Sequence, residues 1–254
     1  MNIICLIKQV PDTEAKIKVK PEVKDIDREG LNMVLNPYDE FAVEEAIRLR
    51  DKDGGSVTII TLGGKKSEEA VRTALAMGAD KAVRIDFEDV AKADVAATAA
   101  ALAGAVKKQE CDLILCGKQA MDDDASQVGL LVAELLGLPV VNVVTKLEIA
   151  GGKATATREI EGGSETVEVP LPAVITCTKG LNEPRYPSLP GIMKAKRKPL
   201  DIMAPADAGM GDARTEVAEM MPPPARAAGK KFEGEAAEVT PQVVKLLRDE
   251  AKII

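Results

Sequence analysis

The stretch Asp112–Val141, DLILCGKQAMDDDASQVGLLVAELLGLPVV, decides the fold class of this chain. Its residues 113–115 form an unbroken apolar run, which is typical of a strand covered on both faces by helices. Gly117 then permits a sharp exit into a polar loop, and residues 125–136 have the pattern of a helix. A strand, a glycine-started loop and a helix in this order are typical of a nucleotide site in an open parallel sheet.

The polar loop at residues 117–128 is the first candidate site. Its backbone N–H groups lie at the start of a helix, where partial positive charge attracts a phosphate or another polar ligand edge, and Lys118 adds a formal charge. The alternative is that the acidic residues 122–124 only cap the following helix and balance its dipole. The loop alone leaves both interpretations open.

Short apolar runs alternate with helical segments from residue 2 to residue 144, which predicts parallel βαβ units. The expected strands are IICLI, VTIITL, KAVRI, DLILC and VVNVV, and the expected helices cover residues 37–50, 68–77, 91–108 and 125–136. Asn36 and Ser67 are expected to cap the first two helices. We therefore predict an α/β fold, a Rossmann-like open, mainly parallel sheet with helices on both faces.

The second half of the chain changes character. An alternating stretch around Gly151 and Gly152 predicts an antiparallel hairpin, LPAVITC predicts another buried strand, and the proline-rich stretch that follows predicts a surface loop. Residues 201–238 are expected to be extended, and a terminal helix to start at Thr240 and Pro241. We expect a domain at 1–200 and an extended C-terminal arm at 201–254, whose helix docks on its own body or on another subunit.

Composition excludes several classes of function. The chain has 254 residues and a net charge of −7, so nucleic acid is not an expected partner. It has no histidine, which removes the commonest general base and most zinc sites. We expect no catalytic residues and no metal site, and chemistry that comes from a cofactor.

The sequence also predicts the compartment. No apolar stretch reaches the length of a membrane span and no secretion signal precedes the first strand, so we expect a cytoplasmic protein without direct membrane insertion. The four cysteines have no CxxC spacing and are expected to be reduced and mostly buried.

Four segments carry a resemblance to a known family. They are AVEEAIRLR at 42–50, RTALAMGAD at 72–80, GKQAMDDD at 117–124 and LNEPRYPSLPGIMKAKRKPL at 181–200. Together they resemble the beta subunit of electron transfer flavoproteins, and the similarity runs from the N-terminus to the terminal helix. The string at 181–198 is the most specific, and GKQAMDDD is the next.

The resemblance implies a heterodimer with a larger alpha subunit, which holds the redox-active FAD and receives the terminal helix. The beta subunit would bind an adenine nucleotide, namely AMP as a structural ligand or, in electron-bifurcating members, a second FAD. Electrons would pass from acyl-CoA dehydrogenases of fatty acid beta-oxidation to the FAD, and then to a quinone oxidoreductase or another acceptor. The beta subunit would be a scaffold in this electron transport and not an independent enzyme.

The resemblance also implies the positions that bind the nucleotide. They are Leu6, Asn36, Pro37, Tyr38, Asp39, Leu62, Gly117, Lys118, Gln119, Ala120, Met121, Asp122, Asp123, Asp124, Ala125, Ser126, Gln127 and Val128. Leu6 and Leu62 would contact the adenosine, and the Asn36 side chain a base or ribose edge. The helix start near Ser126 and Gln127 suits the phosphate. The structural alternatives are a helix cap for Asn36 and core positions for the two leucines.

The acidic loop bears on the choice between AMP and FAD. Asp123 adds bulk and negative charge where the bifurcating members tend to have glycine, which disfavours a diphosphate. SerGlnValGly at 126–129 leans towards FAD instead. We predict AMP.

The segment at 181–198 resembles the one with which these proteins bind acyl-CoA dehydrogenases. The expected docking residues are Leu189, Pro190, Ile192, Met193, Lys194 and Arg197. Leu189 aligns with the anchoring leucine, as a small apolar plug for a partner's pocket, and the basic run beside it could steer an acidic partner. The alternative is that Leu189 folds back onto the body and the basic run is only a solvated face.

Two other classes of function remain as alternatives. An ATP-using enzyme, such as an ATP pyrophosphatase or ligase, would need a phosphate-binding loop after the first strand, where Lys8, Gln9 and Val10 stand, and the chain has no GxxxxGK[ST] motif. A nonenzymatic nucleotide sensor resembling universal stress proteins would need neither the arm nor the basic segment.

Overall fold

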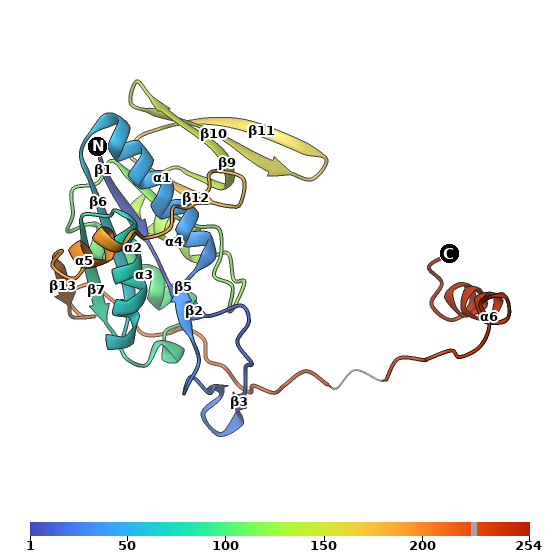
Figure 1. Ribbon diagram of the computed structural model, residues 1–254. Helices are drawn as coiled ribbons and strands as arrows, with labels where there is room; N and C mark the ends of the chain where they lie inside the picture. Colours follow the sequence, from blue (N-terminus) through green and yellow to red (C-terminus); the bar gives the residue numbers. More distant parts are fainter. Residues whose placement is uncertain (225–227) are drawn as a thin grey trace. The chain divides into compact units, whose positions relative to one another are not determined.

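The structure is a computed structural model that describes residues 1–224 and 228–254. The chain divides into two compact units, Met1–Met220 and Met221–Ile254. The first unit contains a sheet of nine described strands in the order β11-β10-β9-β12-β8-β1-β6-β7-β13 (Figure 1). These strands are β1 (Asn2–Leu6), β6 (Ser56–Gly63), β7 (Lys81–Asp86), β8 (Leu113–Gly117), β9 (Val140–Ala150), β10 (Lys153–Ile160), β11 (Gly163–Pro170), β12 (Ala173–Cys177) and β13 (Leu200–Met203).

The central sheet is mainly parallel. The pairs from β9 through β12, β8, β1, β6 and β7 to β13 are parallel, whereas β10 pairs antiparallel with both β9 and β11. After β1 the chain adds β6 and β7 on one side and then returns to add β8 on the other side. The order of the strands therefore reverses between β1 and β8, which is where open α/β sheets bind ligands.

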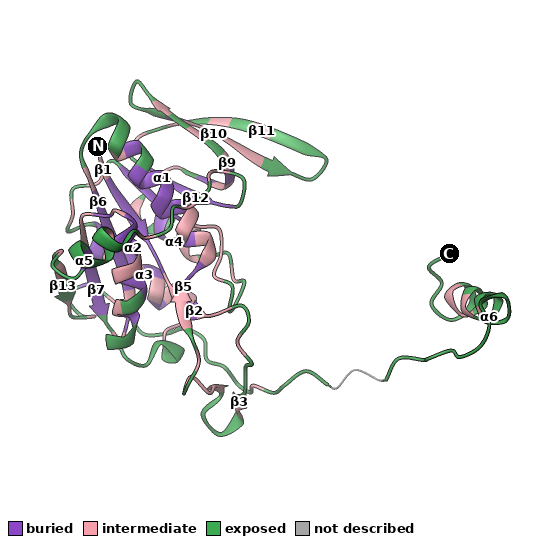
Figure 2. Cartoon of the chain, in the orientation of Figure 1, coloured by how far each residue is buried: buried purple, intermediate pink, exposed green. Residues whose placement is uncertain are grey.

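Helices cover both faces of this sheet, so the predicted α/β fold is confirmed (Figure 1). The helices α1 (Pro37–Asp53) and α2 (Glu68–Met77) pack on one face, and α3 (Val95–Val106) and α4 (Val128–Leu136) on the other. In β1, Ile3 and Cys5 face the first layer, and Ile4 and Leu6 face the second. Burial is deepest in these central strands and much lower in β10 and β11 (Figure 2).

The antiparallel hairpin and the strand LPAVITC are also confirmed, as β9–β10 and β12. The hairpin turns at Gly151 and Gly152, whose φ angles of +58° and +76° are those that a tight two-residue turn requires. The prediction did not include β11. This strand extends the hairpin, and its residues alternate between half-buried and exposed.

Several helix boundaries differ from the prediction. Helix α2 has the expected bounds, but α1 continues to Asp53 and α4 starts only at Val128. A 3-10 turn, η3 (Val90–Lys92), precedes α3, which begins after Asp94 because the carboxylate of Asp94 accepts a hydrogen bond from Ala97 N at 2.8 Å.

Asn36 and Ser67 occupy the predicted N-cap positions of α1 and α2, but neither side chain makes a capping hydrogen bond. Ser67 belongs to a 3-10 turn, η2 (Lys65–Ser67), and its hydroxyl donates to Gly64 O at 2.7 Å.

The prediction of a surface loop up to residue 200 is wrong in two places. It contains a short helix, α5 (Leu189–Ala195), and it ends in β13. The helix is capped by Ser188, whose Oγ accepts a hydrogen bond from Gly191 N at 3.1 Å. Pro190 lies in its first turn, a position where proline is favourable.

A small excursion between β1 and α1 was also not predicted. It contains β2 (Gln9–Pro11), β3 (Val19–Lys20), the 3-10 turn η1 (Pro21–Val23), β4 (Asp25–Ile26) and β5 (Met33–Leu35). β2 pairs with β5, and β3 with β4, both antiparallel.

Residues 201–220, which we expected in the arm, belong to the first unit. Here β13 pairs with β7. Ala208 is fully buried against α3, and its carbonyl oxygen occupies the space that a Cβ on Gly104 would need. The part of the expected arm at 225–227 lies outside the described residues.

The second unit contains α6 (Ala236–Asp249). The helix begins four residues before the predicted start, and Pro241 lies inside it. No helix among residues 1–224 and 228–254 is long and apolar enough to cross a membrane.

Candidate functional site

The candidate site lies where β1 and β8 end side by side. Leu6, the last residue of β1, pairs with Cys116 of β8. Lys8 follows β1 and the polar loop follows β8, while the first turn of α1 brings Asn36 and Asp39 to the same place. The structure thus brings together the predicted residues of α1 and those of the loop, although 78 positions separate Asp39 from Gly117.

Asp39 joins the two strand ends. Its Oδ2 accepts a hydrogen bond from Lys8 N at 2.8 Å, and its Oδ1 accepts one from Gly117 N at 2.8 Å. The residue is only 5% exposed, and this burial raises the pKa of its carboxyl to about 7, against the lowering effect of the two N–H groups. Asp39 therefore stabilises the frame of the site.

Asn36 holds the polar loop. Its Nδ2 donates to Gln119 O at 2.9 Å, and its Oδ1 accepts from Met121 N at 3.2 Å. The side chain is buried and satisfied on both ends by the loop backbone. Its structural role is thus to fix the loop. This role differs from the two that the sequence suggested, a helix cap and a contact with a base or ribose edge.

The acidic residues of the loop are paired with a lysine. Lys8 Nζ lies 2.7 Å from Asp122 Oδ1 and 3.0 Å from Asp123 Oδ2. The pairs are partly exposed, so their contribution to stability is small. They nevertheless tie the loop to the end of β1, and the sequence had no signal for Lys8 beyond its place after a strand.

The loop contains two residues in the left-handed region of backbone conformation. Asp124 has a φ of +49° and Ser126 one of +55°. Gln119 supports this turn, since its Nε2 donates to Asp124 Oδ1 at 2.5 Å and its Oε1 accepts from Ser126 Oγ at 3.1 Å. Non-glycine residues adopt this conformation rarely, and they cluster at ligand sites.

A cavity of about 120 Å³ lies beside the start of α4. Its lining combines the expected residues Lys118, Gln119 and Ser126 with Gly129, Leu130, Asn142, Val143 and Thr176. The last three come from β9 and β12. The position of β12 next to β8, and of β9 beyond it, could not be read from the sequence. Val143 has a φ of +59°, and its N–H donates to Thr176 Oγ1 at 2.9 Å.

The donors around this cavity suit an anionic ligand group. The N–H groups in the first turn of α4 have no acceptor within the helix and carry its positive dipole end. The ammonium of Lys118 lies 5.0 Å from the ring centre of Tyr38, so Tyr38 and Lys118 meet at the site.

Two glycines let the backbone segments approach closely. A Cβ on Gly117 would lie 2.5 Å from Asp39 Oδ1, and one on Gly129 would lie 2.6 Å from Cys116 Sγ. The glycines at the end of β8 and in the first turn of α4 are therefore required by the packing of the site.

The remaining predicted residues lie around this frame. Leu6 is buried in the core and Leu62, near the end of β6, is half-buried, so both fit the core interpretation. Pro37 starts α1, and Ala120, Ala125, Gln127 and Val128 belong to the loop and the start of α4. Contact of any of them with a nucleotide remains a prediction.

The predicted docking residues form an exposed apolar patch on α5. Leu189 is 79% exposed and Met193 is 65% exposed, while Ile192 and Pro190 are also exposed. The alternative in which Leu189 folds back onto the body is therefore wrong. Lys194 and Arg197 are exposed beside the patch.

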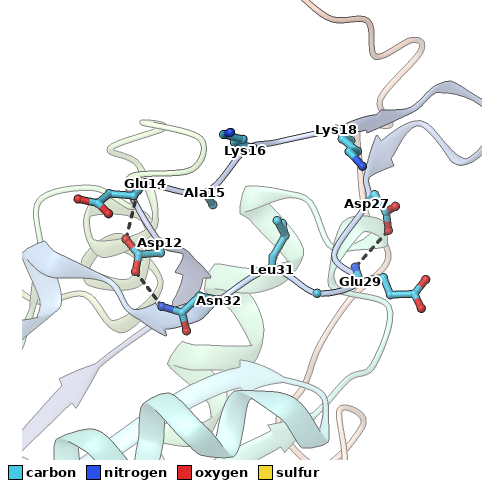
Figure 3. A pocket seen from close by; sticks show the side chains of 10 residues that line it. Asp12, Glu14, Ala15, Lys16, Lys18, Asp27, Glu29, Leu31 and Asn32 are labelled. Atoms are coloured by element: carbon cyan, nitrogen blue, oxygen red, sulfur yellow. Dashed lines mark hydrogen bonds between the residues drawn. The ribbon is translucent and has the colours of Figure 1, made fainter.

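A larger hollow of about 570 Å³ lies in the excursion between β2 and β5 (Figure 3). Most of its lining residues are charged or polar, and Asp12, which accepts from Asn32 Nδ2 at 2.8 Å, connects its two sides. Sequence analysis did not indicate it. No group of His, Cys, Asp and Glu side chains in the described part of the chain could hold a metal ion.

The four cysteines are free thiols, and three of them, Cys5, Cys116 and Cys177, are buried near the strand ends. Burial raises the pKa of each of these thiols. They are core residues without nucleophilic character.

Comparison with known proteins identifies the family. Residues 23–208 match the electron transfer flavoprotein domain. The electron transfer flavoprotein subunit beta of Bacillus subtilis is 46% identical over 259 residues, with 100% of both chains covered, and that of Syntrophomonas wolfei is 45% identical, with 100% and 98% covered. The caffeyl-CoA reductase-Etf complex subunit CarD of Acetobacterium woodii is 38% identical, with 98% of each chain covered. The chain therefore belongs to the beta-subunit family of electron transfer flavoproteins.

Proposed function

We propose that this chain binds AMP at the ends of β1 and β8 and supports the FAD-carrying alpha subunit of a heterodimer. In this complex it docks acyl-CoA dehydrogenase-type flavoproteins, and the electrons continue to a quinone oxidoreductase. FAD bound by the alpha subunit supplies the redox chemistry. The chain itself acts as scaffold and docking subunit without catalysis of its own, in the cytoplasm.

The convergence of Asn36, Asp39 and the polar loop at the reversal of strand order carries this proposal. The side chain of Asn36 binds the polar loop and that of Asp39 binds the strand ends. Their polar atoms are therefore occupied, and the ligand is bound by the loop that they position. The donors left for a phosphate are the first-turn N–H groups of α4 and Lys118. A cavity of about 120 Å³ accommodates a phosphate group at this end, with the nucleoside directed towards Leu6 and Leu62.

The charge of the loop supports AMP over a second FAD. Asp122 and Asp123 place two carboxylates next to the site, and Lys8 is the cation that both of them contact. A second phosphate group would place further anionic oxygens beside these carboxylates and would compete for Lys8. A monophosphate places fewer oxygens there.

The docking role is supported by the patch on α5. Leu189 and Met193 expose apolar surface on a capped helix whose backbone packs against α2. Lys194, Lys196 and Arg197 lie next to them and favour an acidic partner. The half-buried apolar residues of α6, which include Val243 and Leu246, are the surface that we assign to the alpha subunit.

The experiment is to purify the two-subunit complex, denature it and quantify the released nucleotides by chromatography. We expect one AMP and one FAD per complex. Two FAD without AMP would replace the AMP proposal by the electron-bifurcating alternative. One FAD per complex with no AMP would refute the proposed site.

A further inference from the structure

The residues that precede α5 are fastened to the middle of α1. Arg185 Nε lies 2.7 Å from Glu44 Oε2, and Arg185 Nη2 lies 2.9 Å from Glu44 Oε1, which is a two-pronged ion pair. The backbone N–H of Arg185 also donates to Glu44 Oε2, at 3.2 Å. A planar guanidinium bound through two nitrogens has a defined orientation, so the pair fixes the path of the chain as well as a charge.

The next residue of α1 makes a second attachment. Asn182 Nδ2 donates to Glu45 Oε2 at 2.9 Å and to Phe41 O at 3.0 Å. Glu44 and Glu45 are only 5% and 7% exposed. Two adjacent buried glutamates are costly in a helix unless both are paired. Here Glu44 is paired by Arg185, and Glu45 by Asn182 and by Arg48 of the same helix, whose Nη1 lies 3.7 Å from Glu45 Oε2.

The residues that follow α5 are fastened to α2. Arg72 Nη1 donates to Ala195 O at 2.7 Å and to Lys198 O at 3.0 Å. Lys198 Nζ in turn donates to Leu75 O at 2.9 Å, near the end of α2. In addition, Gly191 passes so close to α2 that a Cβ on it would lie 2.5 Å from Ala76 O.

Between these two attachments lies the exposed apolar surface. Tyr186 is 96% exposed, and Leu189 and Met193 follow it on α5. Such exposed side chains contribute little to the stability of this chain. The backbone that carries them is nevertheless held at both ends by polar contacts. Fixing a binding segment before it meets its partner lowers the entropy cost of association.

We propose that Glu44 is a positioning residue for partner docking, which through its ion pair with Arg185 holds residues 182–188 so that Leu189 is presented in its binding geometry. The inference rests on the proposed docking function of α5. The inference adds a second role for α1. Its first turn contributes to the proposed nucleotide site, and Glu44 in its middle sets the geometry of the docking segment. Arg185 contacts Glu44, and its Nη1 also lies 3.6 Å from Asp51 Oδ2 on the same helix; it need not touch the partner for this role.

The first experiment measures order without any partner. Amide hydrogen exchange of the intact two-subunit complex is compared for the wild type, Arg185→Ala, the conservative Arg185→Lys and the control Lys52→Ala, which removes an exposed charge from the same helix. We expect exchange in residues 186–195 to become about ten- to a hundredfold faster in both Arg185 variants and to stay unchanged in the control. Unchanged exchange in the Arg185 variants would overturn the proposal, whatever the partner is.

The second experiment measures docking. With the complex as electron acceptor of an acyl-CoA dehydrogenase, Arg185→Lys should raise KM by about tenfold and leave kcat unchanged, because the electron path is intact once the partner is bound. If Leu189→Ala leaves KM unchanged, the proposed docking function is wrong; if Leu189→Ala raises KM and Arg185→Lys does not, only the positioning role of Glu44 is wrong.

Discussion

The carboxylate of Asp39 accepts a hydrogen bond from the backbone N–H of Gly117 at 2.8 Å, although Asp39 opens a helix and Gly117 ends a strand on the other side of β1. The second oxygen of the same carboxylate binds Lys8 N. One buried side chain thereby connects the segments that leave β1 and β8. The shape of the candidate site depends on this connection more than on any residue of the polar loop.

Replacing Asp39 by Asn should destabilise the chain by about 1–3 kcal/mol, because the amide NH2 group would face a backbone N–H that then loses its acceptor. Denaturant unfolding of the purified complex measures the change. Glu40→Gln is the matched control, since it removes a neighbouring carboxylate of α1 that the strand ends do not use. Equal stability of Asp39→Asn and wild type would contradict the role of Asp39 as a connection.

Stability should depend on pH through the same residue. Burial raises the pKa of Asp39 from 3.8 to about 7, so the folded state favours the protonated form. The stabilisation from this group is complete below pH 3.8 and is lost as the pH rises through about 7. Unfolding free energies across this range should therefore fall with pH by a component that Asp39→Asn abolishes; an identical pH profile in the two proteins would refute the assignment.

Gly117→Ala should disrupt the nucleotide site. Its new methyl group would lie 2.5 Å from Asp39 Oδ1 and 2.6 Å from Tyr38 Cβ, so the first turn of α1 must move. We expect a loss of about 1–3 kcal/mol in stability and a purified complex depleted of nucleotide. Gly211→Ala serves as the control because no atom lies within 4 Å of the added Cβ. Full nucleotide occupancy in Gly117→Ala would show that the site tolerates the shift.

Leu189→Ala should weaken docking without affecting the fold. The side chain is 79% exposed, so little is lost within this chain, whereas a buried anchor at an interface contributes on the order of 2 kcal/mol or more. We expect the KM of the partner dehydrogenase for the complex to rise by on the order of tenfold. Leu135→Ala, which truncates a 47% exposed leucine on α4, should leave KM unchanged.

The parts of the fold that the sequence predicted are those with a local physical signature. The unbroken apolar run at 113–115 marks a strand buried on both faces, and Gly151 with Gly152 marks a tight hairpin. Helix α2 is amphipathic and followed by Gly78, so its bounds were predictable to the residue. The edge strands are harder to predict, since β13 has only four residues without alternation and β11 has an alternation of half-buried and exposed residues with no fully buried position.

The sequence predicted where the candidate site lies but not which groups are hydrogen-bonded within it. A glycine-started loop before a helix pointed to residues 117–128, and Asn36 and Asp39 were expected there only from family resemblance. Their bonds to Gln119 O, Met121 N, Lys8 N and Gly117 N span more than 30 positions, and no pattern in the sequence specifies such partners. For α5 a local signal did exist, because Ser188 before Pro190 is a helix start.

The burial of Ala208 against α3 sets a limit to how far the chain can be shortened from its C-terminus. Asp94, which caps α3 with one oxygen, uses the other to accept hydrogen bonds from Arg214 N at 2.7 Å and Thr215 N at 2.9 Å. A truncation placed before Ala208 would uncover the alanine-rich surface of α3 to water, and one placed before Arg214 would strip Asp94 of two donors. A stand-alone first unit must therefore extend at least to Thr215.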